Sequence, residues 1–134
     1  MKLPTLEETR ARLVTQFEDP SSLNIGAFSE GQLAASLNFR IPFADHPWAK
    51  HIASFGMGVR RSYWGLGIGR KILELQEAHA KKIGISRIEA MVRVKNDRGI
   101  QLYMRNGFVI EGTRLQAAKI DEQFHDEYFI AKII

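Results

Sequence analysis

The sequence of 134 residues contains no cysteine, and this absence removes several kinds of chemistry together. Thiol nucleophiles, disulfide bonds and thiolate metal ligands are all excluded. Long hydrophobic runs are absent too, because no apolar segment approaches the ~18 residues that a membrane-spanning helix needs. The N-terminus also lacks the apolar core of a signal peptide. We therefore expect a cytoplasmic protein that does not associate with membranes.

Composition and length predict one folded domain. Hydrophobic residues make up 45% and charged residues 25% of the chain, close to the values of globular proteins. A chain of this length buries roughly two-thirds of the surface of its unfolded state, which is enough for one core. We expect residues 1–134 to form a single domain.

Charge is distributed unevenly along the chain. Residues 60–105 hold 11 of the 19 Lys and Arg but only 4 of the 15 Asp and Glu, a local balance of +7 against −3 elsewhere. Such a basic segment suits a polyphosphate ligand. Nucleic acid is not the expected partner, because the basic residues are not interleaved with a helix-turn-helix or an aromatic stacking platform.

A glycine-rich turn lies inside this basic segment, between an apolar strand-like stretch and a helix-like one. Gly65, Gly67 and Gly69 permit positive φ and a close approach of a ligand to the main chain. The first turn of the following helix offers N–H groups without intrahelical partners and a partial positive charge. The junction therefore predicts an anion site.

Two known phosphate-binding motifs do not match this turn. A P-loop would need Gly-Lys-Ser/Thr, but the chain continues Gly69-Arg70-Lys71-Ile72. A dinucleotide fingerprint would need its third glycine at position 70, which is arginine, although Glu89 is roughly placed for the ribose contact. A tight turn with glycines that serve only helix packing is the structural alternative.

Periodicity predicts alternating helices and strands. A helix is expected over residues 5–17, with a capping box of Thr5 and Glu8 and an end before Asp19-Pro20. A second helix is expected over residues 68–83 and a short one from 96 or 97 to 105, each closed by a glycine. The predicted strands are 23–28, 32–41, 52–59, 87–94, 108–111 and 124–133, with turns at 29–31 and 121–122.

Three motifs, taken in order, resemble the GCN5-related N-acetyltransferase superfamily. Residues 64–69 resemble its pyrophosphate loop, Arg/Gln-x-x-Gly-x-Gly/Ala, with Trp64 in the first position. Residues 96–108 resemble its Asn-x-x-Ala-x-x-Leu-Tyr-x-x-x-Gly-Phe pattern. Residues 111–113 with 126–131 resemble the C-terminal hairpin of members that acetylate small amines, amino acids or protein N-termini.

The resemblance implies an α/β (α+β) fold with a mixed central sheet flanked by helices, and acetyl-CoA as acyl donor. We expect the family's first strand to be missing, because only four residues precede the first predicted helix. Either the sequence starts within the natural domain, or the sheet has an exposed edge that a second copy could cover. We expect a homodimer, and sedimentation as a monomer at micromolar concentration would exclude it.

The resemblance also implies site residues. The main chain of Met57, Gly58 and Val59 would bind the pantetheine arm and the thioester oxygen, and Tyr103 would be the general acid toward the CoA thiolate. A core tyrosine and ordinary core strand residues are the structural alternatives. The remaining donor-binding residues are Trp64, Gly65, Leu66, Gly67, Ile68, Gly69, Arg70 and Asn96, of which Asn96 could equally be a plain helix cap.

No general base stands out. Some family members carry a glutamate on the strand before the glycine loop, but residues 52–59 contain none. Glu111, Asp126, His51 and a water relay are alternatives. No metal site is expected, because His46, His79 and His125 lack ligand spacing.

Two functions remain open. One is direct acetyl transfer to a primary amine in a ternary complex, and the other is a module that binds or senses acyl-CoA with little or no catalysis.

Overall fold

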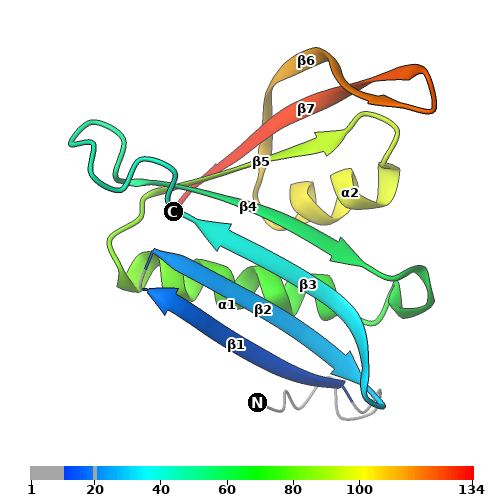
Figure 1. The fold of residues 1–134 in the computed structure, drawn as a ribbon, viewed down its shortest axis with the longest axis horizontal. Coiled ribbons are helices and arrows are strands. Elements are labelled where there is room, and N and C mark those ends of the chain that lie inside the picture. Colours follow the sequence, from blue (N-terminus) through cyan, green and yellow to red (C-terminus); the bar gives the residue numbers. More distant parts are fainter. Residues whose placement is uncertain (1–10, 20) are drawn as a thin grey trace.

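The computed structural model describes residues 11–19 and 21–134, with side chains from residue 21 onward, as one sheet and two helices. The seven strands lie in the order β1-β2-β3-β4-β5-β7-β6 (Figure 1). All neighbours are antiparallel except β4 and β5. The elements are β1 (Ala11–Asp19), β2 (Ser22–Ser29), β3 (Gln32–Arg40), β4 (Ile52–Val59), α1 (Ile68–Lys82), β5 (Arg87–Arg93), α2 (Asp97–Arg105), β6 (Val109–Ile120) and β7 (Gln123–Ile133).

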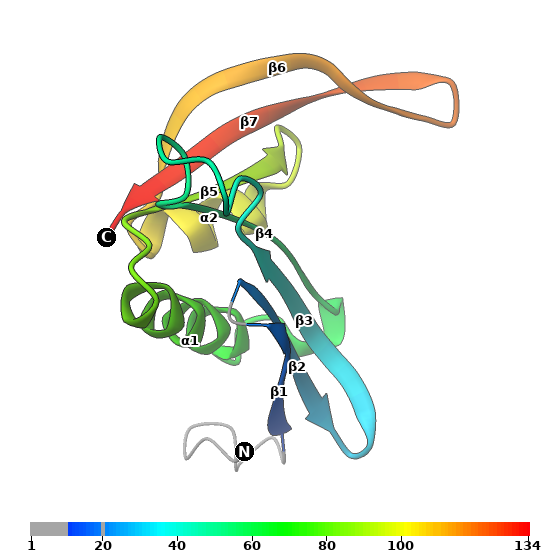
Figure 2. The ribbon, with the colours of Figure 1, turned by 60° about the vertical axis from the view of Figure 1, so that its left-hand side comes forward.

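Both helices lie on the same face of the sheet (Figure 2). Alternate residues of the central strands point toward them, which is the period of two that a half-buried strand requires. The buried strand residues include Leu23, Ile25, Leu37, Phe39, Ala53, Phe55, Ile88, Ala90 and Val92. α1 contributes Ile68, Ile72, Leu73 and Ala80 to the same core. The core therefore lies between the helices and the middle of the sheet.

The expected mixed sheet flanked by helices is confirmed. All six predicted strands and both predicted helices after residue 20 are present, most with ends within two residues of the prediction. The turn between β2 and β3 contains Glu30 at φ 52° and Gly31 at φ 79°, and Asp121 and Glu122 between β6 and β7 also have positive φ. Two-residue turns of this kind match the twist of antiparallel strands.

The predicted helix over residues 5–17 is wrong for residues 11–17, which belong to β1. There Leu13 lies opposite Ala27 of β2 and Phe17 lies opposite Leu23. The spacing of four between Leu13 and Phe17 fits a helix and a strand alike, since four is also a multiple of two. Pairing with β2 decides between them. Residues 5–10, with the predicted capping box, lie outside the described residues.

β1 changes which strand forms the edge of the sheet. The expected absence of a first strand would leave β2 at the edge, but Ala11–Asp19 covers β2. The edge strand on this side of the described sheet is therefore β1.

β6 is longer than predicted, because it continues from residue 111 to Ile120 along β7. The register shifts between Ile110 and Gly112 and again between Arg114 and Ala118, and Gln116 has φ 52°. Such bulges interrupt the alternation of side chains. For this reason the sequence pattern indicated a loop where the strand continues.

β4 and β5 separate partway along their length. Their parallel pairing covers only Ile52 with Arg87, Ala53 with Ile88 and Ser54 with Glu89. β4 then continues to Val59 and β5 to Arg93 without pairing to each other. The C-terminal half of β4 is consequently bonded to β3 on one side only.

An ion pair between Glu77 of α1 and Lys132 of β7 generates a prediction about acid stability. The hydrogen bond from Lys132 is the largest cause that lowers the pKa of Glu77 below 4.5. A lowered folded-state pKa adds stability above the unfolded value, and this stability is lost as pH falls through the folded value. We expect Lys132→Met to cost about 1 kcal/mol at pH 7 and to reduce the dependence of unfolding free energy on pH below about 4.5.

Urea unfolding at pH 3 to 7 measures this effect. The matched control is Lys119→Met, because Lys119 pairs with the exposed Glu122 at 3.5 Å. Equal pH dependence in the two variants would contradict the assigned role of Lys132.

Candidate donor-binding site

A cavity of about 800 Å³ lies where β4 ends, the glycine turn begins and α2 crosses nearby. β4, the turn, the start of α1 and α2 supply its walls, while β5 supplies none of the lining residues. Its lining residues are Met57, Gly58, Val59, Tyr63, Trp64, Gly65, Gly67, Ile68, Gly69, Arg70, Asn96, Arg98, Gly99, Gln101, Leu102, Tyr103, Arg105 and Asn106.

The glycine turn has a conformation that requires glycine at two positions. Gly65 and Gly67 have φ 78° and 79°, and a Cβ at either would meet no atom within 4 Å. Backbone conformation, and not crowding, therefore explains both residues. Gly67 is also the N-cap of α1, so no side chain caps that helix, and its first turn contains no acidic residue. The N–H groups in the first turn of α1, with their partial positive charge, are therefore available to bind an anion.

Gly69 has a different role, because it allows the two helices to approach each other. A Cβ on Gly69 would lie 2.7 Å from Cδ2 of Leu102 in α2. Real Cβ atoms do not approach other atoms this closely, so a side chain here would displace Leu102. The absence of a side chain thus brings α2 against the glycine turn.

Asn96 caps α2 and lines the cavity. Its Oδ1 accepts a hydrogen bond of 3.0 Å from the backbone N–H of Gly99. A Cβ on Gly99 would lie 2.5 Å from Nδ2 of Asn96. An alanine at position 99, as in the family pattern, would therefore require the Asn96 amide to shift. The helix-cap alternative is therefore correct for Oδ1, and it is compatible with a ligand contact through the rest of the side chain.

Tyr103 lies on the inner face of α2 and is only 7% exposed. Its ring packs edge-on against Phe55 of β4 and Phe108, with centroids 5.7 and 5.9 Å away. Burial raises the pKa of Tyr103 to about 12, because the ionised phenolate would lose its hydration. The phenol is therefore protonated throughout the neutral range. Tyr103 is both a core tyrosine and a lining residue of the cavity.

Eleven of the twelve residues expected to act in catalysis or donor binding line this cavity. The exception is Leu66, which is 42% exposed and is not among the lining residues. Seven further lining residues were not predicted from the sequence, namely Tyr63, Arg98, Gly99, Gln101, Leu102, Arg105 and Asn106. Six of them belong to residues 96–108, which contain the second motif and α2. They are spaced three or four residues from Asn96 or from one another, and residues at this spacing share one side of a helix, so the pattern could have identified them.

None of the base candidates lines the cavity. Glu111 is held by two hydrogen bonds from the Arg87 guanidinium, which lower its pKa. Asp126 accepts a hydrogen bond of 2.8 Å from the backbone of Gln116, inside the β6–β7 hairpin. His51 lies in the turn before β4. Among the residues described, the cavity lining includes no carboxylate and no histidine.

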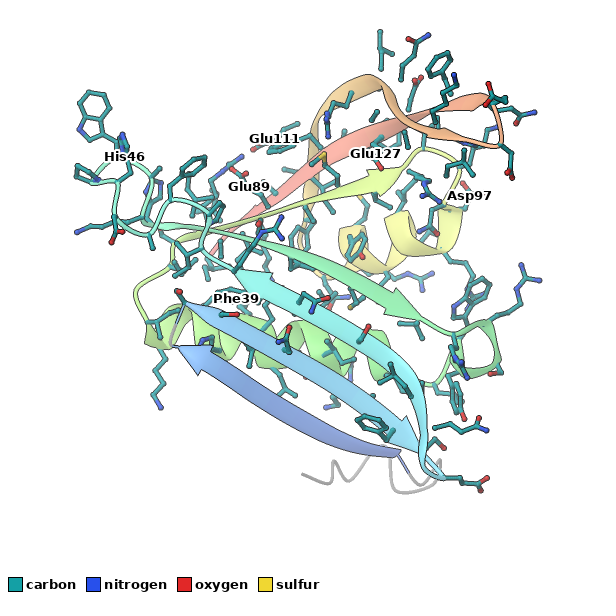
Figure 3. The ribbon with its side chains drawn as sticks, viewed as in Figure 1. Phe39, His46, Glu89, Asp97, Glu111 and Glu127 are labelled. Atoms are coloured by element: carbon teal, nitrogen blue, oxygen red, sulfur yellow. The ribbon has the colours of Figure 1, made fainter. Side chains whose placement is uncertain are left out.

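The histidines lie apart from this cavity. His46 is on the loop between β3 and β4, at the opposite end of the sheet from Asp97 of α2 (Figure 3). His79 of α1 packs edge-on against Phe39 in the core. Within residues 11–19 and 21–134, no group of three or more potential ligands is arranged to hold a metal ion. In the same part of the chain, neither helix is long and apolar enough to cross a bilayer.

Comparison with known proteins agrees with this geometry. The family model described as "Acetyltransferase (GNAT) family" matches residues 2–108, most of the chain. The chain belongs to this family. A GNAT acetyltransferase from Streptococcus pneumoniae has a similar fold, with a TM-score of 0.78 and 29% identity over 87% of this chain and 69% of that one.

Two curated relatives show how the lengths compare. A mycothiol acetyltransferase from Propionibacterium freudenreichii is 25% identical over 92% of this chain but only 39% of its own length. An L-amino acid N-acetyltransferase from Escherichia coli, AaaT, is 28% identical over 85% of this chain and 70% of its own. The chain thus spans well under half of the first relative and about two-thirds of the second.

The burial of Tyr103 predicts how the tyrosines titrate. The chain has three tyrosines, and we expect one of them to ionise only near pH 12. Absorbance at 295 nm against pH measures this, and Tyr103→Phe should remove the late step. Because a raised folded-state pKa adds stability that is lost between the unfolded value of about 10 and the folded value, alkaline unfolding should begin there. A late step that persists in Tyr103→Phe would contradict the assignment.

Proposed function

We propose that residues 1–134 form one acetyl-CoA-binding domain of an N-acetyltransferase, which moves the acetyl group to a primary amine by direct transfer. The observation that carries this proposal is the cavity in which β4, the glycine turn and Tyr103 meet. Membership of the GNAT family supports acetyl-CoA as the donor.

Backbone groups would bind the donor. The uncapped start of α1 and its glycine turn suit the pyrophosphate. Beyond Ser54, the edge of β4 that faces away from β3 is not paired with β5, so the main chain of Met57 can bond the pantetheine arm there. The main chain of Gly58 faces the other way, toward Ser36 of β3. The carbonyl of Val59 is a different case, because it already accepts a hydrogen bond of 2.9 Å from the Trp64 indole.

The transfer step needs a neutral amine, a stabilised oxyanion and a proton for the leaving thiolate. The amine lone pair attacks the thioester carbon, a C–N bond forms and the C–S bond breaks. The electron pair of that bond leaves on the CoA sulfur. With no cysteine in the chain, no thiol can carry the acetyl group in between, which supports direct transfer in a ternary complex.

Tyr103 would assist the departing sulfur as a hydrogen-bond donor. The pKa of the Tyr103 phenol, about 12, is well above the pKa of a thiol, near 8.5. Complete proton transfer from the phenol to the thiolate would therefore be uphill by roughly 5 kcal/mol. A hydrogen bond that strengthens as charge develops on sulfur avoids most of this cost. The raised pKa guarantees that the proton is present.

The proton of the acceptor would leave to solvent through water. An alkyl ammonium with a pKa near 10.4 costs roughly 5 kcal/mol to deprotonate at pH 7. The described lining of the cavity offers no carboxylate or histidine as a direct base. Small primary amines, including amino acids, are the acceptor class that we propose, in keeping with the name of the Escherichia coli relative.

A module that binds acyl-CoA without catalysis is the second candidate, and the missing base favours it. Acetyl-CoA at 100 times its dissociation constant should raise the thermal midpoint by on the order of 10 °C under either function. Turnover separates the two. Because the protein contains no cysteine, a thiol reagent reports released CoA without background from the chain.

We expect Tyr103→Phe to retain the thermal shift with acetyl-CoA and to lose about 10²-fold in turnover with a panel of amino acids. The matched control is Tyr128→Phe, since Tyr128 is half-buried on β7 and does not line the cavity. A thermal shift without turnover in the unmodified protein would favour the sensing module. The absence of any shift would exclude both functions.

A further inference from the structure

Trp64 connects three parts of the cavity wall. It follows a short 3-10 helix, Arg61–Tyr63, and precedes Gly65 of the glycine turn. Its indole Nε1 donates a hydrogen bond of 2.9 Å to the carbonyl of Val59 at the end of β4. The guanidinium of Arg98, in the first turn of α2, lies 4.5 Å from the centroid of the same ring. One side chain thus joins β4, the turn and α2.

Arg98 is a cation without a carboxylate partner in the described part of the chain. Arg70 differs, because it forms an ion pair with Glu74 at 3.5 Å. Contact with an aromatic face occupies only the face of a guanidinium and leaves its in-plane N–H groups available. Since Arg98 also lines the cavity, these donors are available to an anion there.

A second cation and the helix start add to this positive charge. Arg61 lies 5.3 Å from the centroid of the Trp64 ring and is likewise unpaired among the described residues. The uncapped first turn of α1 begins three residues after Gly65, at Ile68. The unpaired guanidinium of Arg98 and the free helix N–H groups therefore lie at the same end of the cavity, and Arg61 adds a second positive charge beside the Trp64 ring.

Position 64 is where the family's loop pattern has Arg or Gln. Tryptophan there removes a polar side chain from the loop, but its ring face attracts a guanidinium from another element. The positive charge at this end of the cavity then comes from α2 instead of from the loop.

We propose that Arg98 binds a phosphate group of the CoA moiety and that Trp64 is a positioning residue that holds Arg98 in place. This inference rests on the proposed function, because it concerns the same donor. The pyrophosphate and the ribose 3′-phosphate have the same chemistry, so either could be the group that Arg98 contacts.

Calorimetric titration with CoA and with 3′-dephospho-CoA tests the proposal. We expect Arg98→Gln to weaken CoA binding by about tenfold or more, as loss of a charge-assisted hydrogen bond requires. Arg98→Lys should lose less, since it keeps the charge without the planar contact. The matched control, Arg40→Gln, removes an exposed arginine at the far end of β3 and should leave affinity unchanged. If Arg98 contacts the 3′-phosphate, Arg98→Gln and the unmodified protein should have similar affinities for 3′-dephospho-CoA. If Arg98 contacts the pyrophosphate, Arg98→Gln should bind 3′-dephospho-CoA more weakly than the unmodified protein does.

A double-mutant cycle separates positioning from general stability. Trp64→Leu should weaken CoA binding. The double variant, Trp64→Leu with Arg98→Gln, should bind CoA with an affinity within about twofold of that of Arg98→Gln alone. Trp64→Phe keeps an aromatic face and should stay within about threefold of the unmodified protein. Additive losses would overturn the positioning role of Trp64.

Fluorescence provides a test that does not depend on how Trp64→Leu folds. The chain has two tryptophans, and Trp48 is 84% exposed on a distant loop, so Trp48→Phe leaves Trp64 as the only reporter. In that background Arg98→Gln should change the emission and move the response to CoA to about tenfold higher concentration. Unmodified protein that fails to bind CoA would overturn the proposed function and this inference together. CoA binding that Arg98→Gln leaves intact would overturn the inference alone.

Discussion

The site depends on one interruption of backbone pairing, where β4 and β5 separate after Ser54 and Glu89. Unpaired backbone groups need partners, and in this protein they border a cavity instead of a neighbouring strand. The glycine turn follows the unpaired half of β4 after a short 3-10 helix, so the exposed strand edge and the free N–H groups of α1 lie in one continuous stretch of chain. A long ligand with a polyphosphate at one end matches that arrangement.

α2 completes the cavity because several contacts hold it against β4 and the turn. Tyr103 packs with Phe55 and Phe108, Leu102 fills the space that Gly69 leaves, and Arg98 stacks on Trp64. Each contact fixes a different part of the helix. The aromatic cluster also excludes water from the phenol of Tyr103, and the same packing that positions this group therefore keeps it protonated.

Local patterns predicted most of the fold and most of the cavity lining. Glycine positions and helical periodicity are local properties, so the turn, α1 and α2 could be found from the sequence, whereas Tyr103 was predicted from the resemblance of residues 96–108 to the family motif. β1 could not, because the spacing of Leu13 and Phe17 fits either element and only pairing with β2 decides. The separation of β4 from β5 and the contact of Arg98 with Trp64 depend on long-range geometry that no short segment encodes.

Amide chemical shifts measured by ¹⁵N–¹H correlation during a CoA titration would test the central claim, that the unpaired end of β4 and the glycine turn form the donor site. We expect saturable shifts that are largest at Met57, Gly58, Gly65, Gly67 and Gly69, with smaller changes along β6 and β7. Saturable shifts confined to the β6–β7 hairpin, or no shifts at all, would contradict it.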